Sequence, residues 1–165
     1  MVDYQSVIDK YYFDTDDLWQ LLIRHSRQVA DRCLMICDRH PELRLDREFL
    51  EEAAMLHDIG IKWCSAPGIH CHGAELYLRH GVIGGELLRQ EGYERHARVA
   101  ERHTGTGLPG LEPETLEEQV ICYADKFYSK SRPERVLTVA EAAESLEKFG
   151  HEGVVKFMDW AKRFE

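Results

Sequence analysis

The sequence predicts an all-α protein, built as a compact helical bundle. Along most of the chain, apolar residues recur at the three- and four-residue spacing of amphipathic helices. No window alternates β-branched and polar residues with the two-residue period of a strand. The 165 residues contain no internal repeat, low-complexity tract or linker rich in proline and glycine. We therefore expect a single domain over residues 1–165, with a core of its own.

The first predicted helix covers residues 14–39, because acids stand at its start and Pro41 follows its end. The second begins at Asp46, a favourable N-cap, and is expected to extend through Asp58, with Gly60 as its C-terminal stop. These two helices would supply the first half of the bundle.

Shorter helices are expected after a loop that contains Pro67 and Gly68. Their approximate ranges are 74–78, 82–90, 94–103, 114–130, 138–149 and 151–164. The irregular loop 104–110 could offer backbone N–H groups to a phosphate. The last helices, within 132–165, could form a lid, a homodimer surface or the remainder of the core.

The acidic composition excludes one class of function. The formal charge of −9 argues against binding to duplex nucleic acid, which calls for a basic surface. An anionic substrate would need positive charge supplied locally. No apolar run is long enough for a membrane span, and no signal peptide is visible. The five cysteines do not form a secreted disulfide framework, so we expect a reduced, cytoplasmic protein with no membrane partner.

Several of the nine histidines fall on faces that the helices should bury. His25 fills the apolar stripe between Leu22 and Val29, and His57 follows Ala53 and Ala54 on the next helix. The same register places further polar residues on buried faces, namely Asp58, His80, His103 and Asp125.

A metal centre explains these six residues together. Each could instead hydrogen-bond a neighbour, but four imidazoles and two carboxylates from separate helices do not easily satisfy one another. One or two ions would do so, and this donor set suits Zn, Fe, Mn, Ni or Co. We interpret the loop histidines His70 and His72 as surface or substrate-contacting residues. Ordinary surface positions are expected for His40, His96 and His151.

The order of these residues resembles the HD-domain superfamily of metal-dependent phosphohydrolases, in its HDIG form. The tetrapeptide His57-Asp58-Ile59-Gly60 carries the name motif, with His25 upstream and Asp125 downstream. A His-Gly-x-x-Gly segment begins at His80, a His-Thr pair at His103, and an Ala-Asp-Lys segment ends at Lys126. Similar motifs occur in bacterial HD hydrolases that split dinucleoside tetraphosphates symmetrically. The resemblance covers roughly residues 18–131.

The resemblance implies a site with two metal ions. His25, His57, Asp58 and Asp125 would bind one ion, and Asp58 would bridge to a second ion held by His80 and His103. The ions expected are Fe, Mn, Ni, Co, Zn or Mg. With a single ion, the latter two histidines would instead donate to phosphate. The candidate phosphate-binding residues are Lys62, Lys126, Arg79 and Arg102.

The expected function is therefore hydrolysis of a phosphoester or phosphoanhydride in a small molecule, with a nucleotide or dinucleotide as the expected substrate. In this reading Asp58 also positions the hydroxide that attacks phosphorus. Two alternatives stay open. Some HD-fold proteins with this ligand series are di-iron oxygenases, and a metal-supported helical domain could sense a nucleotide without turnover.

Overall fold

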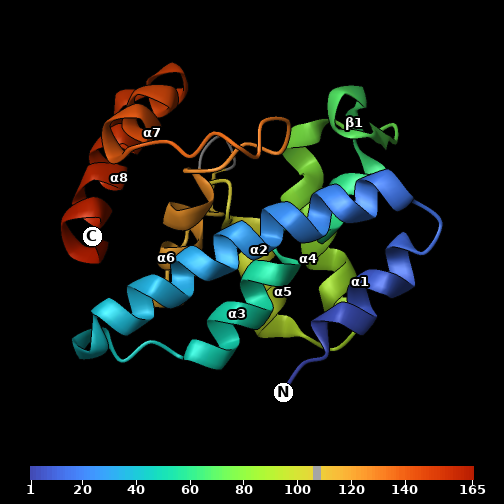
Figure 1. Ribbon diagram of the computed structural model, residues 1–165, viewed down its shortest axis with the longest axis horizontal. Helices are drawn as coiled ribbons and strands as arrows, with labels where there is room; N and C mark the ends of the chain where they lie inside the picture. Colours follow the sequence, from blue (N-terminus) through green and yellow to red (C-terminus); the bar gives the residue numbers. More distant parts are fainter. Residues whose placement is uncertain (106–108) are drawn as a thin grey trace.

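The computed structural model describes residues 1–105 and 109–165, and it is a bundle of α-helices (Figure 1). The described α-helices are α1 (Tyr4–Tyr12), α2 (Asp16–Arg39), α3 (Arg47–Leu56), α4 (His80–Gln90), α5 (Glu94–Arg102), α6 (Leu116–Asp125), α7 (Val139–Leu146) and α8 (His151–Phe164). Short 3-10 helices are η1 (Pro41–Leu43), η2 (Ile59–Trp63), η3 (Pro67–Ile69), η4 (Tyr77–Arg79) and η5 (Glu147–Phe149). The all-α class is confirmed.

The N-terminal helix α1 was not expected from the sequence. Asp3 caps it, because its carboxylate accepts a hydrogen bond from the backbone N–H of Ser6 at 3.1 Å. Its inner face buries Val7, Ile8 and Tyr12 against α2 and α3. Only this narrow stripe of the helix is apolar, so residues 4–12 are too polar overall for the sequence to predict a helix there.

A two-stranded hairpin is the second unexpected element. Strand β1 (Ser65–Ala66) pairs antiparallel with β2 (Cys71–His72). Each strand is only two residues long, too short for a two-residue period to be visible in the sequence. The hairpin lies at the edge of the bundle, near the end of α4 that starts at His80 (Figure 1).

The predicted ends of the second helix and of the helix over 114–130 were wrong, and both lie next to predicted metal donors. The second helix ends at Leu56 rather than Asp58, because His57 and Asp58 lead directly into η2. Gly60 is not a C-terminal stop; it is the position at which η2 lies directly against the backbone of α4. A Cβ at this position would lie 2.1 Å from the carbonyl oxygen of His80, so only glycine lets α4 approach η2 this closely.

The helix predicted over 114–130 begins at Leu116 and ends at Asp125. Thr115 is its N-cap, in a capping box with Glu118. After Asp125 the chain turns back, and the backbone N–H of Leu137 donates to the carbonyl of Phe127 at 2.9 Å. Residues 106–108 of the predicted phosphate-binding loop lie outside the described residues.

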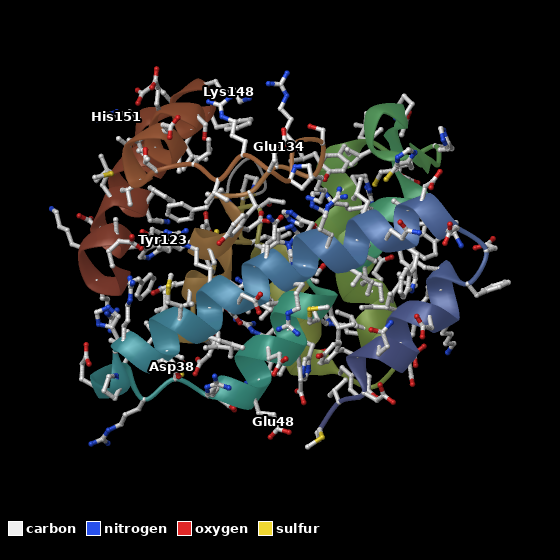
Figure 2. All side chains as sticks on the ribbon, viewed as in Figure 1. Asp38, Glu48, Tyr123, Glu134, Lys148 and His151 are labelled. Atoms are coloured by element: carbon white, nitrogen blue, oxygen red, sulfur yellow. The ribbon has the colours of Figure 1, made fainter. Side chains whose placement is uncertain are left out.

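The core consists of two apolar clusters with the histidines between them. One joins α2, α3 and α6 to the C-terminal helices α7 and α8. The other joins α1 and the start of α2 to η2, α4 and α5. Tyr123 of α6 lies inside the bundle and stacks on Phe157 of α8, with ring centroids 4.8 Å apart. Lys148 and His151 project outward (Figure 2).

The C-terminal helices therefore complete the core, one of the roles considered for them. Within the described ranges, no helix combines the length and the apolar character needed to cross a membrane.

Candidate metal centre

Six histidine and aspartate side chains that could hold metal ions meet inside the bundle. The middle of α2 provides His25, and the turn after α3 provides His57 and Asp58. The remaining donors stand at helix ends: His80 at the start of α4, His103 just after α5, and Asp125 at the end of α6. The four histidines and Asp58 are buried, and 15% of the Asp125 side chain is exposed.

Asp58 lies at the centre of this cluster. The Nε2 atoms of His25 and His57 lie 3.2 and 3.0 Å from its Oδ2 atom. The Nε2 atoms of His80 and His103 both lie 3.2 Å from its other oxygen, Oδ1. One carboxylate therefore faces a different pair of imidazoles with each of its oxygens.

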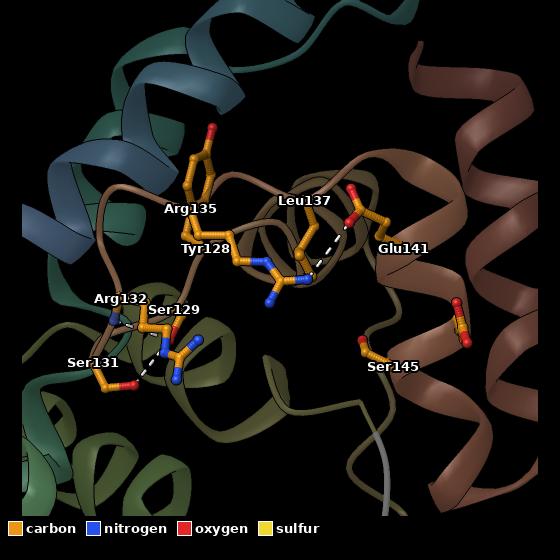
Figure 3. A pocket seen from close by; sticks show the side chains of 9 residues that line it. Tyr128, Ser129, Ser131, Arg132, Arg135, Leu137, Glu141 and Ser145 are labelled. Atoms are coloured by element: carbon orange, nitrogen blue, oxygen red, sulfur yellow. Dashed lines mark hydrogen bonds and ion pairs between the residues drawn. The ribbon is translucent and has the colours of Figure 1, made fainter.

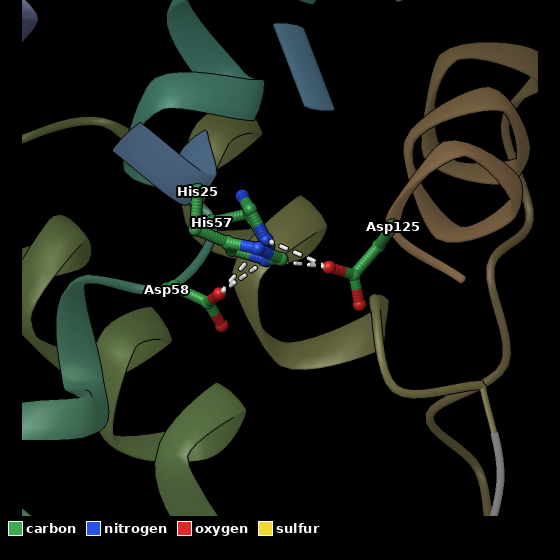
Figure 4. Close-up of side chains that lie close together, drawn as sticks. All are labelled: His25, His57, Asp58 and Asp125. Carbon is green, nitrogen blue, oxygen red and sulfur yellow. Dashed lines mark hydrogen bonds and ion pairs between the residues drawn. The ribbon is translucent and has the colours of Figure 1, made fainter. Parts of the chain in front are cut away.

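Asp125 completes one of the two halves. Its Oδ1 atom lies 2.9 Å from Nε2 of His25 and 3.3 Å from Nε2 of His57 (Figure 4). The cluster thus divides into two sets of donors that share Asp58. Within each set, the donor atoms all lie within 4.8 Å of one another. The sets are His25, His57, Asp58 and Asp125 on one side, and Asp58, His80 and His103 on the other.

Local backbone contacts determine which imidazole nitrogen faces the centre. The Nδ1 atoms of His57, His80 and His103 lie 2.5, 2.5 and 2.6 Å from the carbonyl oxygen three residues earlier. A carbonyl accepts, so we assign the Nδ1 proton to each bond, which leaves Nε2 with a lone pair. Metal-binding histidines are oriented by this same type of contact.

Lone-pair-bearing atoms of several donors face one another in this centre. The Nε2 atoms of His80 and His103 are 3.0 Å apart, and in the assigned tautomer neither has a proton to donate. The Oδ1 atom of Asp58 and the Nδ1 atom of His25 have no hydrogen-bond donor or acceptor among the described residues, and the Oδ2 atom of Asp58 faces the ammonium of Lys130 at 2.9 Å. Donors bound to one ion at about 2.0–2.2 Å lie about 2.9–3.5 Å from one another. The separations in the cluster fit this geometry.

The electrostatics of the site also favour bound positive charge. Burial alone would lower the pKa of His57, but Asp58 and Asp125 outweigh it and raise that pKa to about 10. Burial dominates at His103, where it lowers the pKa to about 4 against the attraction of Asp58. The pKa of Asp58 is held well below its usual range, because His57 and Lys130 outweigh the effect of its burial. At Asp125 the hydrogen bonds from His25 and His57 outweigh burial and hold the pKa well below its usual range. Both carboxylates are therefore ionised and attract positive charge, which protonated His57 supplies when no ion is bound and which a metal ion would replace.

The four predicted phosphate-binding residues have different surroundings. Lys126 lies beside the cluster: its Nζ atom is 3.8 Å from Oδ2 of Asp125, and it donates to the carbonyl of His103 at 3.0 Å. Lys62 is directed elsewhere, since its Nζ atom donates to the carbonyl of Tyr11 and to Asp14, at 2.7 and 2.8 Å.

Neither predicted arginine contacts the six donors. Arg79 is half exposed and pairs with Glu75 at 3.5 Å. Arg102 donates to the carbonyl of Glu112 at 2.7 Å and pairs with Glu114 at 2.8 Å. Of the four candidates, the structure brings only Lys126 next to the cluster.

Lys130 was missed by the sequence analysis, although it contacts the central carboxylate. Its Nζ atom lies 2.9 Å from Oδ2 of Asp58. No signal in the sequence points to it. In the predicted helix 114–130, a residue five positions after Asp125 would point about 140° away from it. Lys130 reaches Asp58 only because α6 ends at Asp125 and the chain turns back.

The remaining histidines lie outside the cluster. His70 and His72 are exposed in the hairpin, and among the described residues they belong to no set of converging metal donors. His151 is exposed, and His40 pairs with Glu42 at 2.8 Å. The expectation that His96 is a surface residue was wrong.

His96 is buried, and its Nε2 atom lies 2.9 Å from Oε1 of Glu52. The other carboxylate oxygen of Glu52 accepts a hydrogen bond from the backbone N–H of Val2 at 2.7 Å. This buried pair therefore satisfies itself and fastens the N-terminal segment to α3. A signal for it was present, because His96 stands two helical turns before His103 on the same face of α5.

Comparison with known proteins was consistent with this geometry. The model of the HD domain family matches residues 22–129. An uncharacterized protein of Methanocaldococcus jannaschii is 34% identical over 124 residues, which cover 62% of this chain and 67% of that protein. No solved structure was found to match the chain significantly.

Two longer relatives have names that state a function. Both are named tRNA (cytidine(56)-2'-O)-methyltransferase. The one from Picrophilus torridus is 30% identical and the one from Thermoplasma volcanium is 26% identical. The matched segments cover 68% and 66% of this chain but only 33% and 32% of those proteins. The chain thus spans about one third of their length.

Proposed function

This chain belongs to the HD-domain superfamily of metal-dependent phosphohydrolases, and on that premise we propose that it hydrolyses a phosphoester or phosphoanhydride bond in a small molecule. The substrate class that we propose is a nucleotide or dinucleotide. The observation that carries the proposal is the position of Asp58, whose two oxygens face two separate sets of buried metal donors.

Two ions are favoured over one, because both sets of donors are preassembled around the shared carboxylate. Fe, Mn, Ni, Co, Zn and Mg are the candidates that this mixture of imidazole and carboxylate admits. Bound ions would supply a hydroxide nucleophile near neutral pH and would offset the charge of a phosphate. Their positive charge would also offset the repulsion between an anionic substrate and a chain with a net charge of −9.

The residues of the chain have distinct tasks in this proposal. Asp58 holds the two halves together and positions the attacking hydroxide between them. The carbonyl contacts of His57, His80 and His103 keep their Nε2 atoms directed inward. Lys126 is the predicted phosphate-binding residue that lies nearest to the donors, beside Asp125.

The decisive experiment joins metal content to turnover. We expect the purified full chain to contain a transition metal by elemental analysis and to release phosphate from members of a set of phosphorylated metabolites when that metal is supplied. The variants His57→Ala and Asp58→Ala should lose metal and activity together, since each removes a donor from the shared centre.

His151→Ala is the matched control, because it removes an exposed histidine far outside the donor set. It should keep both metal and activity. Full turnover in either His57→Ala or Asp58→Ala with metal retained would refute the assignment of these ligands. Oxygen uptake without phosphate release by the iron-loaded protein would favour the oxygenase alternative instead.

A further inference from the structure

Lys130 is a buried cation next to the proposed centre, and none of the tasks above uses it. Only 13% of its side chain is exposed, and its Nζ atom lies 2.9 Å from Oδ2 of Asp58. The segment that carries it is held against α2, because Arg24 donates to the carbonyl of Lys130 at 3.4 Å and Gln28 donates to the carbonyl of Pro133 at 3.0 Å. Its position is therefore built into the fold.

Burying an ammonium group is costly unless it has a specific partner. The ammonium of Lys130 lies 5.6 Å from the centroid of the Tyr77 ring, and that ring stacks on His80 with centroids 4.4 Å apart. Lys130 is thus placed at the boundary of the donor cluster, with its charge beside the carboxylate that both sets share. An anionic substrate that is attracted to metal ions held by Asp58 would therefore come within reach of the ammonium of Lys130.

Lys130 also forms the inner wall of a cavity of about 390 Å³. The cavity is lined by Ala66, Gly68, Ile69, Tyr77, Lys130 and Ser131. Ala66, Ile69 and Tyr77 give the cavity a largely apolar lining, to which Lys130 and Ser131 add polar groups. Its volume is at the small end of the range of about 300–1,000 Å³ for ligand pockets.

A larger cavity of about 600 Å³ lies between the segment 128–137 and α7, and it contains none of the six donors (Figure 3). It contains Arg132 and Arg135 but also Glu141 and Glu144, so its charges balance. The cavity next to Lys130 is therefore the better candidate for the substrate.

We propose that Lys130 is a substrate-binding residue, whose ammonium holds a phosphoryl oxygen of a small phosphomonoester while the apolar part of that molecule occupies the cavity between the hairpin and Tyr77. This proposal rests on the proposed phosphohydrolase function and narrows the bond that is cleaved to a phosphomonoester, of which a nucleoside monophosphate is one example. It assigns to Lys130 a role that was predicted from the sequence for other basic residues.

The test uses two dianions that are not hydrolysed and differ only in an apolar group, methylphosphonate and phenylphosphonate. Their affinities for the manganese-loaded full chain are measured by isothermal titration calorimetry, and metal content is measured on the same samples. We expect Lys130→Met to keep its metal and to bind both ligands about 10–100-fold more weakly, because a hydrogen bond to a charged group is lost. Lys130→Arg should recover most of that affinity.

Lys162→Met is the matched control, since Lys162 is an exposed lysine on α8. It should bind both ligands as the wild type does. Unchanged affinity in Lys130→Met with metal retained would overturn the proposal. Loss of metal in that variant would also overturn it, because Lys130 would then be only a structural countercharge for Asp58.

The cavity is tested separately with Gly68→Trp. Gly68 lines the cavity, and a Cβ there meets no atom within 4 Å, so a larger side chain can be placed at its wall without displacing the backbone. The wild type should bind phenylphosphonate at least about tenfold more tightly than methylphosphonate, and Gly68→Trp should remove this difference alone. Equal affinities in the wild type would refute the cavity assignment. If metal-loaded wild type bound neither ligand, the proposed function itself would fail.

Discussion

Each of the three histidines His57, His80 and His103 is oriented by the turn of backbone that precedes it. The bond from Nδ1 to the carbonyl three residues earlier makes the orientation of the ring a local property of the chain. Each of these residues stands at a helix end, and the carbonyls of Ala54 and Tyr77 accept from the backbone N–H of the same histidine as well as from its ring. His25, in the middle of α2, has no such bond, and its orientation depends on Asp58 and Asp125 alone.

Glu118 allows a prediction at the same scale, away from the metal donors. Its carboxylate accepts from the backbone N–H groups of Glu114 and Thr115, at 2.9 and 3.1 Å, and from Arg98 at 2.9 Å. Burial would raise its pKa, but these contacts together outweigh burial and hold the pKa below its usual range. The carboxylate therefore stabilises the fold above the pKa of an unfolded glutamate, near 4.3, and that stability is lost as the pH falls through the folded pKa.

We expect Glu118→Gln to be less stable than the wild type at pH 7, with the difference shrinking toward zero as the pH is lowered to about 3. Urea unfolding of both proteins across this range measures the two free energies of unfolding. Glu114→Gln, which changes an exposed acid at the same turn, should show a smaller effect. A difference that stays constant with pH would contradict the ionic role of Glu118.

The individual residues show which positions hydrophobic periodicity can predict to be buried and which it cannot. It placed the six donors on buried faces, because a polar side chain in an apolar stripe is visible in the sequence. The same pattern also indicates the burial of His96, which lies on the same helix face as His103, although His96 was predicted to be at the surface. Lys130 was not predictable, because its place depends on where α6 ends and on how the following segment folds over α2.

At the scale of elements, the helices were predicted well where capping and periodicity agree. Asp46 caps α3 as expected, accepting from the backbone N–H of Phe49 at 3.1 Å, and α8 covers the predicted residues 151–164. The errors lie where tertiary contacts decide the backbone. The helix predicted over 138–149 ends at Leu146, and only a 3-10 turn, η5, continues it. The helix predicted over 74–78 was wrong, because residues 74–76 are not helical and only the 3-10 turn η4 overlaps the end of this range.

The contact between η2 and α4 is the element on which the second donor set depends. Because Gly60 has no side chain, the backbone of His80 lies directly against it. We expect Gly60→Ala to lower the free energy of unfolding by about 1–3 kcal/mol, since the added methyl group would overlap backbone atoms. Displacing the start of α4 should also weaken metal binding.

Gly68→Ala is the control for this prediction, because a Cβ there meets no atom within 4 Å. Chemical denaturation and elemental analysis of the two variants provide the measurements. A Gly60→Ala protein with wild-type stability and metal content would show that the close approach of α4 is not required.

At the scale of the whole molecule, the two apolar clusters enclose the donors from opposite sides. The first cluster includes residues of α2 and α3 as well as of α7 and α8, so the C-terminal helices share a core with the helices that carry His25 and His57. This arrangement supports our proposal that residues 1–165 form one domain. Such a domain should unfold in a single transition.

Metal should stabilise this transition, because a preformed donor set exists only in the folded chain. At a concentration of Mn²⁺ near 100 times its Kd, we expect Tm to rise by about 5–10 °C. Differential scanning calorimetry with and without a chelator measures the shift. Asp58→Ala should show almost no shift, whereas a comparable rise in that variant would place the stabilising ion elsewhere.

The shared carboxylate has a consequence for how this site can vary. Substitutions at His25 or Asp125 alter one half of the centre, and substitutions at His80 or His103 alter the other. Of the six donors, only Asp58 belongs to both halves, since each half uses one of its two oxygens. In related proteins, single substitutions could therefore remove or alter one half of the centre while the other half is kept. No substitution at position 58 could do the same, because it would change both halves.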